Sequence, residues 1–196
     1  MSSLRGSTSL GRGMVIGVLF AVTGCMPAAL EHVGLTARQP VLRPVFEIDG
    51  RLSARHGAEA FAAGFRWHHE REHDELELVS PLGQTIARLS GDAASVQLQN
   101  ADGRVRTAAD WTALTEQGLG WPLPVDGLVF WVQGAPREGA PFTMEPDAEG
   151  RPSVLRQDGW TIAYQAFTPI EDVSRPSRMT LSYPGVELRL VIDVWQ

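Results

Sequence analysis

The sequence is poor in two residue types: its 196 residues include a single cysteine and no lysine. One cysteine excludes an internal disulfide, so the compartment must be inferred from the N-terminus rather than from thiol pairing. All 17 basic residues are arginines, scattered along the chain, and the formal net charge is −6. No basic field would hold a polyphosphate, so we do not expect nucleic acid as a partner. The length and the 43% of hydrophobic residues fit one globular domain with a full-sized core.

The N-terminus has the pattern of an export signal. Arg5 and Arg12 precede an apolar run at residues 14–22, which is shorter than the roughly 20 residues of a membrane-spanning helix. The run ends in Val-Thr-Gly before Cys25, and this ending resembles the lipobox of bacterial lipoprotein signals. The resemblance implies cleavage before Cys25, diacylglycerol on its thiol and an acyl chain on its new amino group. The alternative is a plain secretory peptide in which the cysteine occurs by chance.

The expected organisation has three segments: a cleaved signal at residues 1–24, an acylated tether at residues 25–44 and one domain at residues 45–196. Cleavage would remove two arginines and no carboxylate, so the mature chain would be more acidic than the precursor and would be repelled by anionic membranes. An acyl anchor is then the expected cause of membrane residence. Met26 stands where lipoproteins of the inner membrane commonly carry Asp, which favours the periplasmic face of the outer membrane.

Alternation of apolar and polar residues from residue 45 onward predicts β-strands with one buried face. Turn sequences separate the runs, among them Asp158-Gly159 and Pro184-Gly185. Between residues 108 and 134 the apolar spacing becomes helical, and prolines at 122 and 124 interrupt it. We therefore expect two helices joined by a proline-rich elbow. The predicted strand runs lie within residues 46–54, 61–67, 76–78, 86–89, 96–98, 104–107, 142–145, 154–157, 160–166, 179–183 and 188–194.

A twisted sheet of about 10–11 strands curls rather than lying flat. The expected fold class is mainly β, a half-open antiparallel β-barrel with a helical lid over an apolar cavity. The six tryptophans would fill a packed core as readily as they would line a cavity. An open barrel under a helical cover favours a cavity for an elongated apolar guest. The residues expected to line it are Phe65, Trp67, Leu76, Leu78, Trp111, Leu128, Trp131, Ile162, Tyr164, Leu190 and Ile192.

Several motifs, in order and spacing, together carry a resemblance to a known family. They are the signal ending in Cys25, Gly50-Arg51-Leu52, Phe65-Arg66-Trp67, Ser80-Pro81-Leu82-Gly83-Gln84-Thr85, Leu119-Gly120-Trp121-Pro122-Leu123-Pro124-Val125 with Leu128, Trp131-Val132-Gln133-Gly134, the run from Gln157 to Tyr164, and Pro176-Ser177-Arg178-Met179. In these the chain resembles the outer-membrane lipoprotein receptor family LolB. In that family a helix usually precedes the first strand, whereas Pro40 and Pro44 disrupt any long helix here.

The resemblance also implies a function and its partners. The protein would take lipoproteins from the periplasmic carrier LolA, bind their acyl chains in the cavity and insert them into the outer membrane. Its partners would be that carrier, the client lipoproteins with their acyl chains, and outer-membrane lipid; we expect a monomer. No enzyme activity, metal or cofactor is expected beyond the lipid on Cys25. Transfer needs no nucleotide if each successive site binds the tails better, and the sequence contains no P-loop.

Leu82 is the residue expected to touch the membrane or the incoming acyl chains. Ser80, Pro81 and Gly83 occupy the first, second and fourth places of a favoured type I turn, which leaves Leu82 at the tip. The alternative is that the leucine folds back onto the sheet. With the family resemblance, an exposed apolar tip at Pro81-Leu82-Gly83 is the favoured interpretation.

Two other functions compete with this one. His69, Glu70 and His73 spell the H-E-x-x-H signature of zinc proteases, but that chemistry requires both histidines on one helix face. Strand patterns on both sides predict a charged hairpin loop at residues 69–74, which argues against a zinc hydrolase. The other alternative is a structural or assembly lipoprotein of the outer membrane that binds a protein partner rather than lipid.

Overall fold

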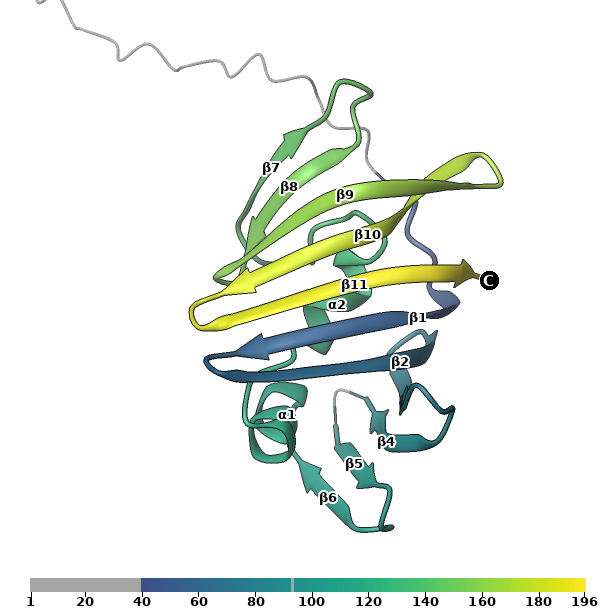
Figure 1. Ribbon diagram of the computed structural model, residues 1–196. Coiled ribbons are helices and arrows are strands. Elements are labelled where there is room, and N and C mark those ends of the chain that lie inside the picture. The colour runs from purple at the N-terminus through teal and green to yellow at the C-terminus, as the bar shows by residue number, and fades with distance from the viewer. Residues whose placement is uncertain (1–39, 93) are drawn as a thin grey trace, which may run out of the picture. The chain divides into compact units, whose positions relative to one another are not determined.

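The computed structural model describes residues 40–92 and 94–196 (Figure 1). The predicted signal segment, Cys25 and most of the predicted tether lie outside these residues. All strands and helices of the described part fall within Val45–Trp195. These elements build one core among themselves, and a chain of residues 26–196 contains all of them.

Eleven antiparallel strands form one sheet, in the order β6-β5-β4-β3-β2-β1-β11-β10-β9-β8-β7. The first and last strands pair at its centre, where Leu52 lies opposite Leu190. The two edge strands, β6 and β7, are not paired with each other, so the sheet is an open barrel, as the sequence predicted. The strands are β1 Val45–His56, β2 Glu59–Glu70, β3 His73–Val79, β4 Thr85–Gly91, β5 Val96–Asn100, β6 Val105–Ala108, β7 Phe142–Pro146, β8 Pro152–Gln157, β9 Trp160–Ile170, β10 Val173–Tyr183 and β11 Val186–Trp195.

The core lies on one face of the sheet because apolar residues alternate along each strand. Trp67, Leu76, Leu89 and Leu98 occupy one row across β2, β3, β4 and β5, and all four are buried. Gly50 stands at a bulge in β1, where a Cβ would lie 2.2 Å from the carbonyl oxygen of Val191. The close approach of two backbones therefore requires glycine at this position.

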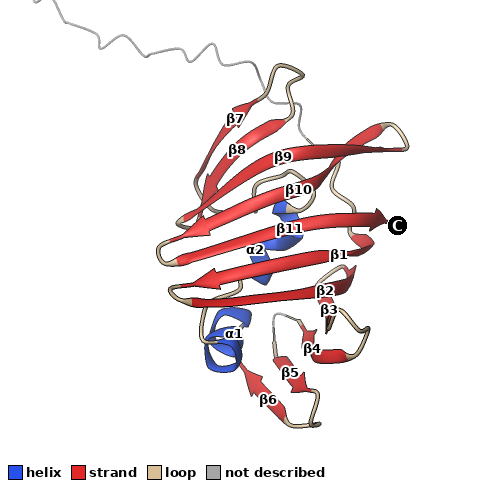
Figure 2. Cartoon of the chain, viewed as in Figure 1, coloured by secondary structure: helices blue, strands red, loops and turns tan. Residues whose placement is uncertain are grey.

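Two helices cover the buried face. α1 (Trp111–Leu119) is capped at its N-terminus by Asp110, whose carboxylate accepts a hydrogen bond from the Ala113 amide at 2.8 Å, and at its C-terminus by Gly120, which has a φ of 83°. α2 (Val125–Trp131) follows the elbow of residues 120–124, as predicted. Figure 2 shows both helices on the same face of the sheet, while no helix of the described residues covers the other face. No helix of the described residues is long and apolar enough to cross a membrane.

Candidate functional site

The inner face of the sheet and the lid enclose a small apolar cavity. Its volume is about 20 Å³, enough for about one water molecule. Five of the residues predicted to line a cavity border it, namely Phe65, Trp67, Leu76, Leu128 and Leu190. The interior of this structure is thus packed with side chains, and an acyl chain can enter only after some of them move.

Four residues around this cavity were not among those predicted: Leu52, Leu123, Val125 and Leu188. Leu123 and Val125 belong to the elbow and to the first position of α2, and both are buried. Prolines on both sides of Leu123 made this segment look like a connector rather than part of the core. The available signal was the apolar residues at alternate positions around those prolines, Trp121, Leu123 and Val125, which a solvent-exposed connector does not need.

The other six predicted lining residues are buried but lie elsewhere in the core: Leu78, Trp111, Trp131, Ile162, Tyr164 and Ile192. Two of them fasten the lid to the sheet. The Trp131 indole donates to Gln157 Oε1 at 2.9 Å, and the Tyr164 hydroxyl donates to the Trp131 carbonyl oxygen at 2.9 Å. Burial raises the pKa of Tyr164, which keeps this phenol protonated as a donor.

The lid is attached unevenly. Beyond α2, Gln133 Oε1 accepts a hydrogen bond from the Arg43 amide at 2.7 Å, which ties this end to the segment before β1. At the elbow, the Leu123 amide donates to Thr115 Oγ1 at 2.8 Å, and that hydroxyl donates to the Trp111 carbonyl oxygen at 2.8 Å. Among the described residues, no hydrogen bond links residues 120–125 to a strand. The elbow is therefore held to the sheet by apolar packing alone.

An acidic cleft of about 530 Å³ adjoins the lid. Trp111, Val129 and Phe130 give it an apolar side. Burial raises the pKa of Asp126, and the negative charges of Asp74 and Asp110 add to the shift. Carboxylates in the lining outnumber arginines; they come from Glu72, Asp74, Asp92, Asp126 and Glu138, against Arg43, Arg71 and Arg137.

Leu82 lies at the tip of the turn between β3 and β4, and 88% of it is exposed. The turn is fixed by its own hydrogen bonds: the Gly83 amide donates to the Ser80 carbonyl oxygen at 2.8 Å, and the Ser80 amide donates to the Gln84 carbonyl oxygen at 2.8 Å. Gly83 has a φ of 79°, which suits glycine. The structure therefore presents Leu82 to solvent on a closed turn, where the sequence predicted it.

A charged cluster secures the base of this turn. Glu77 accepts hydrogen bonds from the Thr85 hydroxyl at 2.6 Å and from Arg88 at 3.1 Å, and Arg66 approaches it to 3.4 Å. The hydrogen bond from Thr85 is the main cause that lowers the pKa of Glu77, and Arg88 and Arg66 lower it further. Because Thr85 is the first residue of β4, the carboxylate pins the strand that leaves the turn.

The residues of the zinc-protease signature do not lie on a helix. The hairpin loop predicted at residues 69–74 is present, but its predicted bounds are wrong. His69 and Asp74 are buried strand residues opposite each other, and only Arg71 and Glu72 form the turn. Asp74 Oδ1 lies 2.9 Å from His69 Nδ1 and accepts a hydrogen bond from the Trp67 indole at 2.7 Å. His73 is exposed, and no three potential ligands cluster among the described residues. The sequence could not show this pairing, because it forms only when the hairpin closes.

Comparisons with known proteins agree with this architecture. A family model described as "Outer membrane lipoprotein LolB" matches residues 44–195. An outer-membrane lipoprotein LolB of Nitrosomonas europaea is 32% identical, over 94% of this chain and 92% of the relative, and one of Thiobacillus denitrificans is 35% identical, over 93% and 96%. The solved LolA superfamily protein of Nitrosomonas europaea has a TM-score of 0.52 at 10% identity, covering 83% of this chain and 90% of that one, a likeness of fold alone. The chain therefore belongs to the outer-membrane lipoprotein LolB family.

Proposed function

We propose that this outer-membrane protein accepts lipoproteins from the periplasmic carrier LolA, holds their acyl chains under its lid and releases them into the outer membrane. Its family consists of lipoprotein-trafficking proteins rather than enzymes. The observation that carries the proposal is the uneven attachment of the lid: α2 and, through Arg106 and the Gln117 carbonyl oxygen, α1 are hydrogen-bonded to the sheet, whereas the apolar elbow between them is held by packing alone.

Acyl chains bind by replacing the elbow on the inner face of the sheet. Leu123 and Val125 line one side of the cavity now, and they move away from the sheet when the elbow swings about the fastened end of α2. The apolar surface that they uncover is covered again by methylenes, each worth about 0.8 kcal/mol. Because acyl methylenes replace the apolar side chains of the elbow on the sheet, opening the lid costs little free energy.

Delivery proceeds through Leu82. Transfer of the exposed leucine on this closed turn out of water is favourable, and the membrane interface offers it an apolar environment. Insertion of this tip brings the protein against the outer membrane, where the acyl chains have their lowest free energy. The transfer is then downhill and needs no nucleotide.

The acidic cleft beside the lid is the place where a carrier docks. It borders Val129 and Phe130 of α2, so a partner bound there touches the element that must move. Its excess of carboxylates selects a basic rim on the partner.

A lipid on Cys25 anchors the protein at the membrane. Cys25 lies outside the described residues, and the support for its acylation is the sequence pattern before it. Two or more acyl chains give stable anchoring where one chain gives marginal binding.

Transfer of a labelled lipoprotein tests the proposal. A carrier loaded with the lipoprotein is mixed with residues 26–196 of this chain, and the label is followed by pull-down and then by flotation with added vesicles. We expect the label to move first to this protein and then to the vesicles. Label that stays on the carrier, together with no quenching of tryptophan fluorescence by a fatty acid, would identify a scaffold that binds protein rather than lipid.

A further inference from the structure

The uncovered face of the sheet contains a groove that the proposed function leaves unused. Its volume is about 850 Å³, and it is lined from β2, β1, β11, β10 and β9 and by Ser80 and Pro81 of the Leu82 turn. Outward-facing small residues, Ser53, Ala62 and Gly64, contribute to the lining. They leave room where longer side chains would fill the hollow.

The charges in this groove are all of one sign. Arg51, Arg178 and Arg189 line it, and no carboxylate does. Arg51 is paired with Asp193 at 2.9 Å and Arg189 with Glu187 at 2.9 Å, both carboxylates lying outside the lining. Arg178 is exposed, and its side chain has neither an ion pair nor a hydrogen bond among the described residues.

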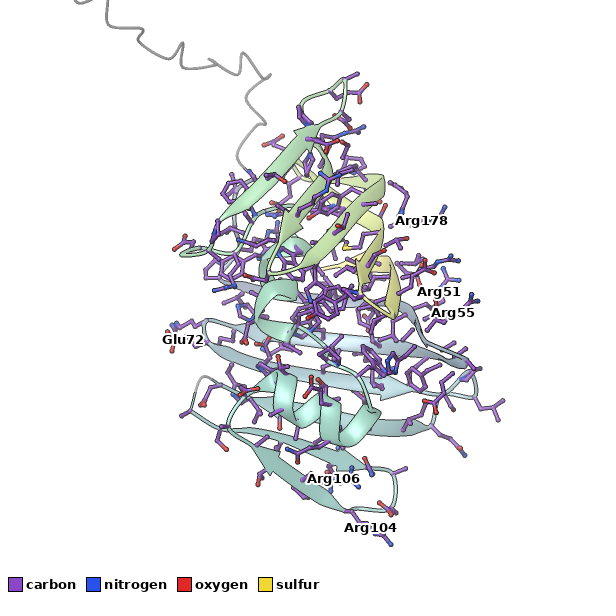
Figure 3. All side chains as sticks on the ribbon, turned by 90° about the vertical axis from the view of Figure 1, so that its left-hand side faces the viewer. Arg51, Arg55, Glu72, Arg104, Arg106 and Arg178 are labelled. Carbon is purple, nitrogen blue, oxygen red and sulfur yellow. The ribbon has the colours of Figure 1, made fainter. Side chains whose placement is uncertain are left out.

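The pairing of the strands places two of these arginines close together. Arg178 and Arg51 both lie opposite Val191 of β11, one from β10 and the other from β1, so they flank one outward-facing residue. Figure 3 shows Arg51, Arg55 and Arg178 projecting from the same side of the sheet, away from the helices. This local basic surface contrasts with the net charge of −6 of the whole chain.

The groove is continuous with the turn that carries Leu82. Pro81 borders the groove and is bonded to Leu82, so their Cα atoms are about 3.8 Å apart. If Leu82 enters the apolar layer of a membrane, the groove lies at the depth of the lipid phosphates, just outside that layer. Arginine suits this ligand because its planar donors pair with two phosphate oxygens at once.

We propose that this outer-face groove binds the phosphodiester headgroup of an anionic phospholipid in the membrane that Leu82 enters. The inference rests on the proposed membrane contact of Leu82 and adds an orientation to it. The uncovered face of the sheet lies against the membrane, and the lid, on the opposite face, points to the periplasm, where a carrier can reach it.

Vesicle binding by residues 26–196 tests the groove. Vesicles of phosphatidylcholine are compared with vesicles of phosphatidylcholine and phosphatidylglycerol in equal parts. Arg178→Glu is expected to weaken binding to the mixed vesicles about tenfold, because it replaces attraction by repulsion at the surface, and to leave binding to phosphatidylcholine unchanged. Ala62→Glu, which places a carboxylate in the same groove, is expected to act in the same direction.

Arg104→Glu is the matched control, since it makes the same change in net charge at an exposed turn before β6. Figure 3 places Arg104 at the far end of the sheet from Arg178. Equal loss of binding in Arg104→Glu and Arg178→Glu would overturn the groove and indicate a general charge effect. Leu82→Glu separates the two proposals: it should weaken binding to both kinds of vesicle, and if it weakens neither, the membrane contact itself is wrong.

Discussion

Two leucines that each follow a proline differ sharply in solvent exposure. Leu82, in Ser-Pro-Leu-Gly, is 88% exposed, whereas Leu123, in Trp-Pro-Leu-Pro, is 4% exposed. The first lies on a turn closed by its own hydrogen bonds between neighbouring strands, and its exposed side chain takes no part in the core. The second lies on the connection between α1 and α2 and packs beside the apolar cavity on the inner face of the sheet.

The comparison shows that attachment decides the role of each leucine. A self-contained turn can expose an apolar side chain without loosening, because no packing depends on it. An elbow held by packing can leave, because few directional bonds oppose its departure. One leucine is therefore suited to meet the membrane and the other to yield its place to an acyl chain.

The largest effect is expected from Leu82→Glu. We expect delivery of lipoproteins to vesicles to be abolished, because a charged tip cannot enter the apolar layer, while the free energy of unfolding changes by less than about 0.5 kcal/mol. The transfer assay gives the first quantity and urea unfolding the second. Val105→Glu, at another exposed apolar residue, is the control that should deliver normally. Normal delivery by a folded Leu82→Glu variant would refute the role of the tip.

Truncating the buried leucine should reverse this pattern. Leu123→Ala removes apolar contacts beside the cavity, and we expect it to lower the free energy of unfolding by about 2–3 kcal/mol. Leu82→Ala should change it by less than about 0.5 kcal/mol. Urea unfolding of both variants measures the contrast directly. Equal destabilisation by the two truncations would mean that the turn depends on packing as much as the elbow does.

Sequence reasoning reached those features that are encoded locally. The Ser-Pro-Leu-Gly turn and the alternation along the strands each depend on neighbours in the chain, and both predictions are confirmed. Features that depend on pairing between strands or on packing between elements were missed. His69 is buried with Asp74 opposite it in the closed hairpin, and Leu123 lines the cavity because the elbow packs on the inner face of the sheet. Periodicity also could not separate a packed interior from a hollow one, because both require the same alternation.

A substitution beside the elbow, with a smaller expected effect, should favour fatty-acid binding over the closed lid. Thr115→Val removes the hydroxyl that accepts from the Leu123 amide, at a cost of about 1–2 kcal/mol to the closed lid. We expect fatty-acid affinity, read from tryptophan quenching, to rise by up to about tenfold, because less free energy is needed to open the lid. Thr112→Val, at an exposed position of α1, is the control and should leave affinity unchanged. Weaker binding by Thr115→Val would show that the closed elbow itself forms the binding site.

The smallest effect is expected at Glu77, in the charged cluster at the base of the Leu82 turn. It is recognised by its change with pH. The pKa of Glu77 is lower in the folded chain than in the unfolded one, so its ionised form stabilises the fold above the unfolded pKa. That stabilisation is lost as pH falls through the lower, folded pKa. Glu77→Gln should therefore be less stable than the parent near pH 7, and the difference should shrink as the solution is acidified.

Urea midpoints across the acid range measure this difference in stability, with Glu72→Gln in the exposed β2–β3 turn as the control. A constant difference at every pH would show that Glu77 acts through its shape and hydrogen bonds and not through its charge, so that the turn is equally firm when the carboxyl is protonated.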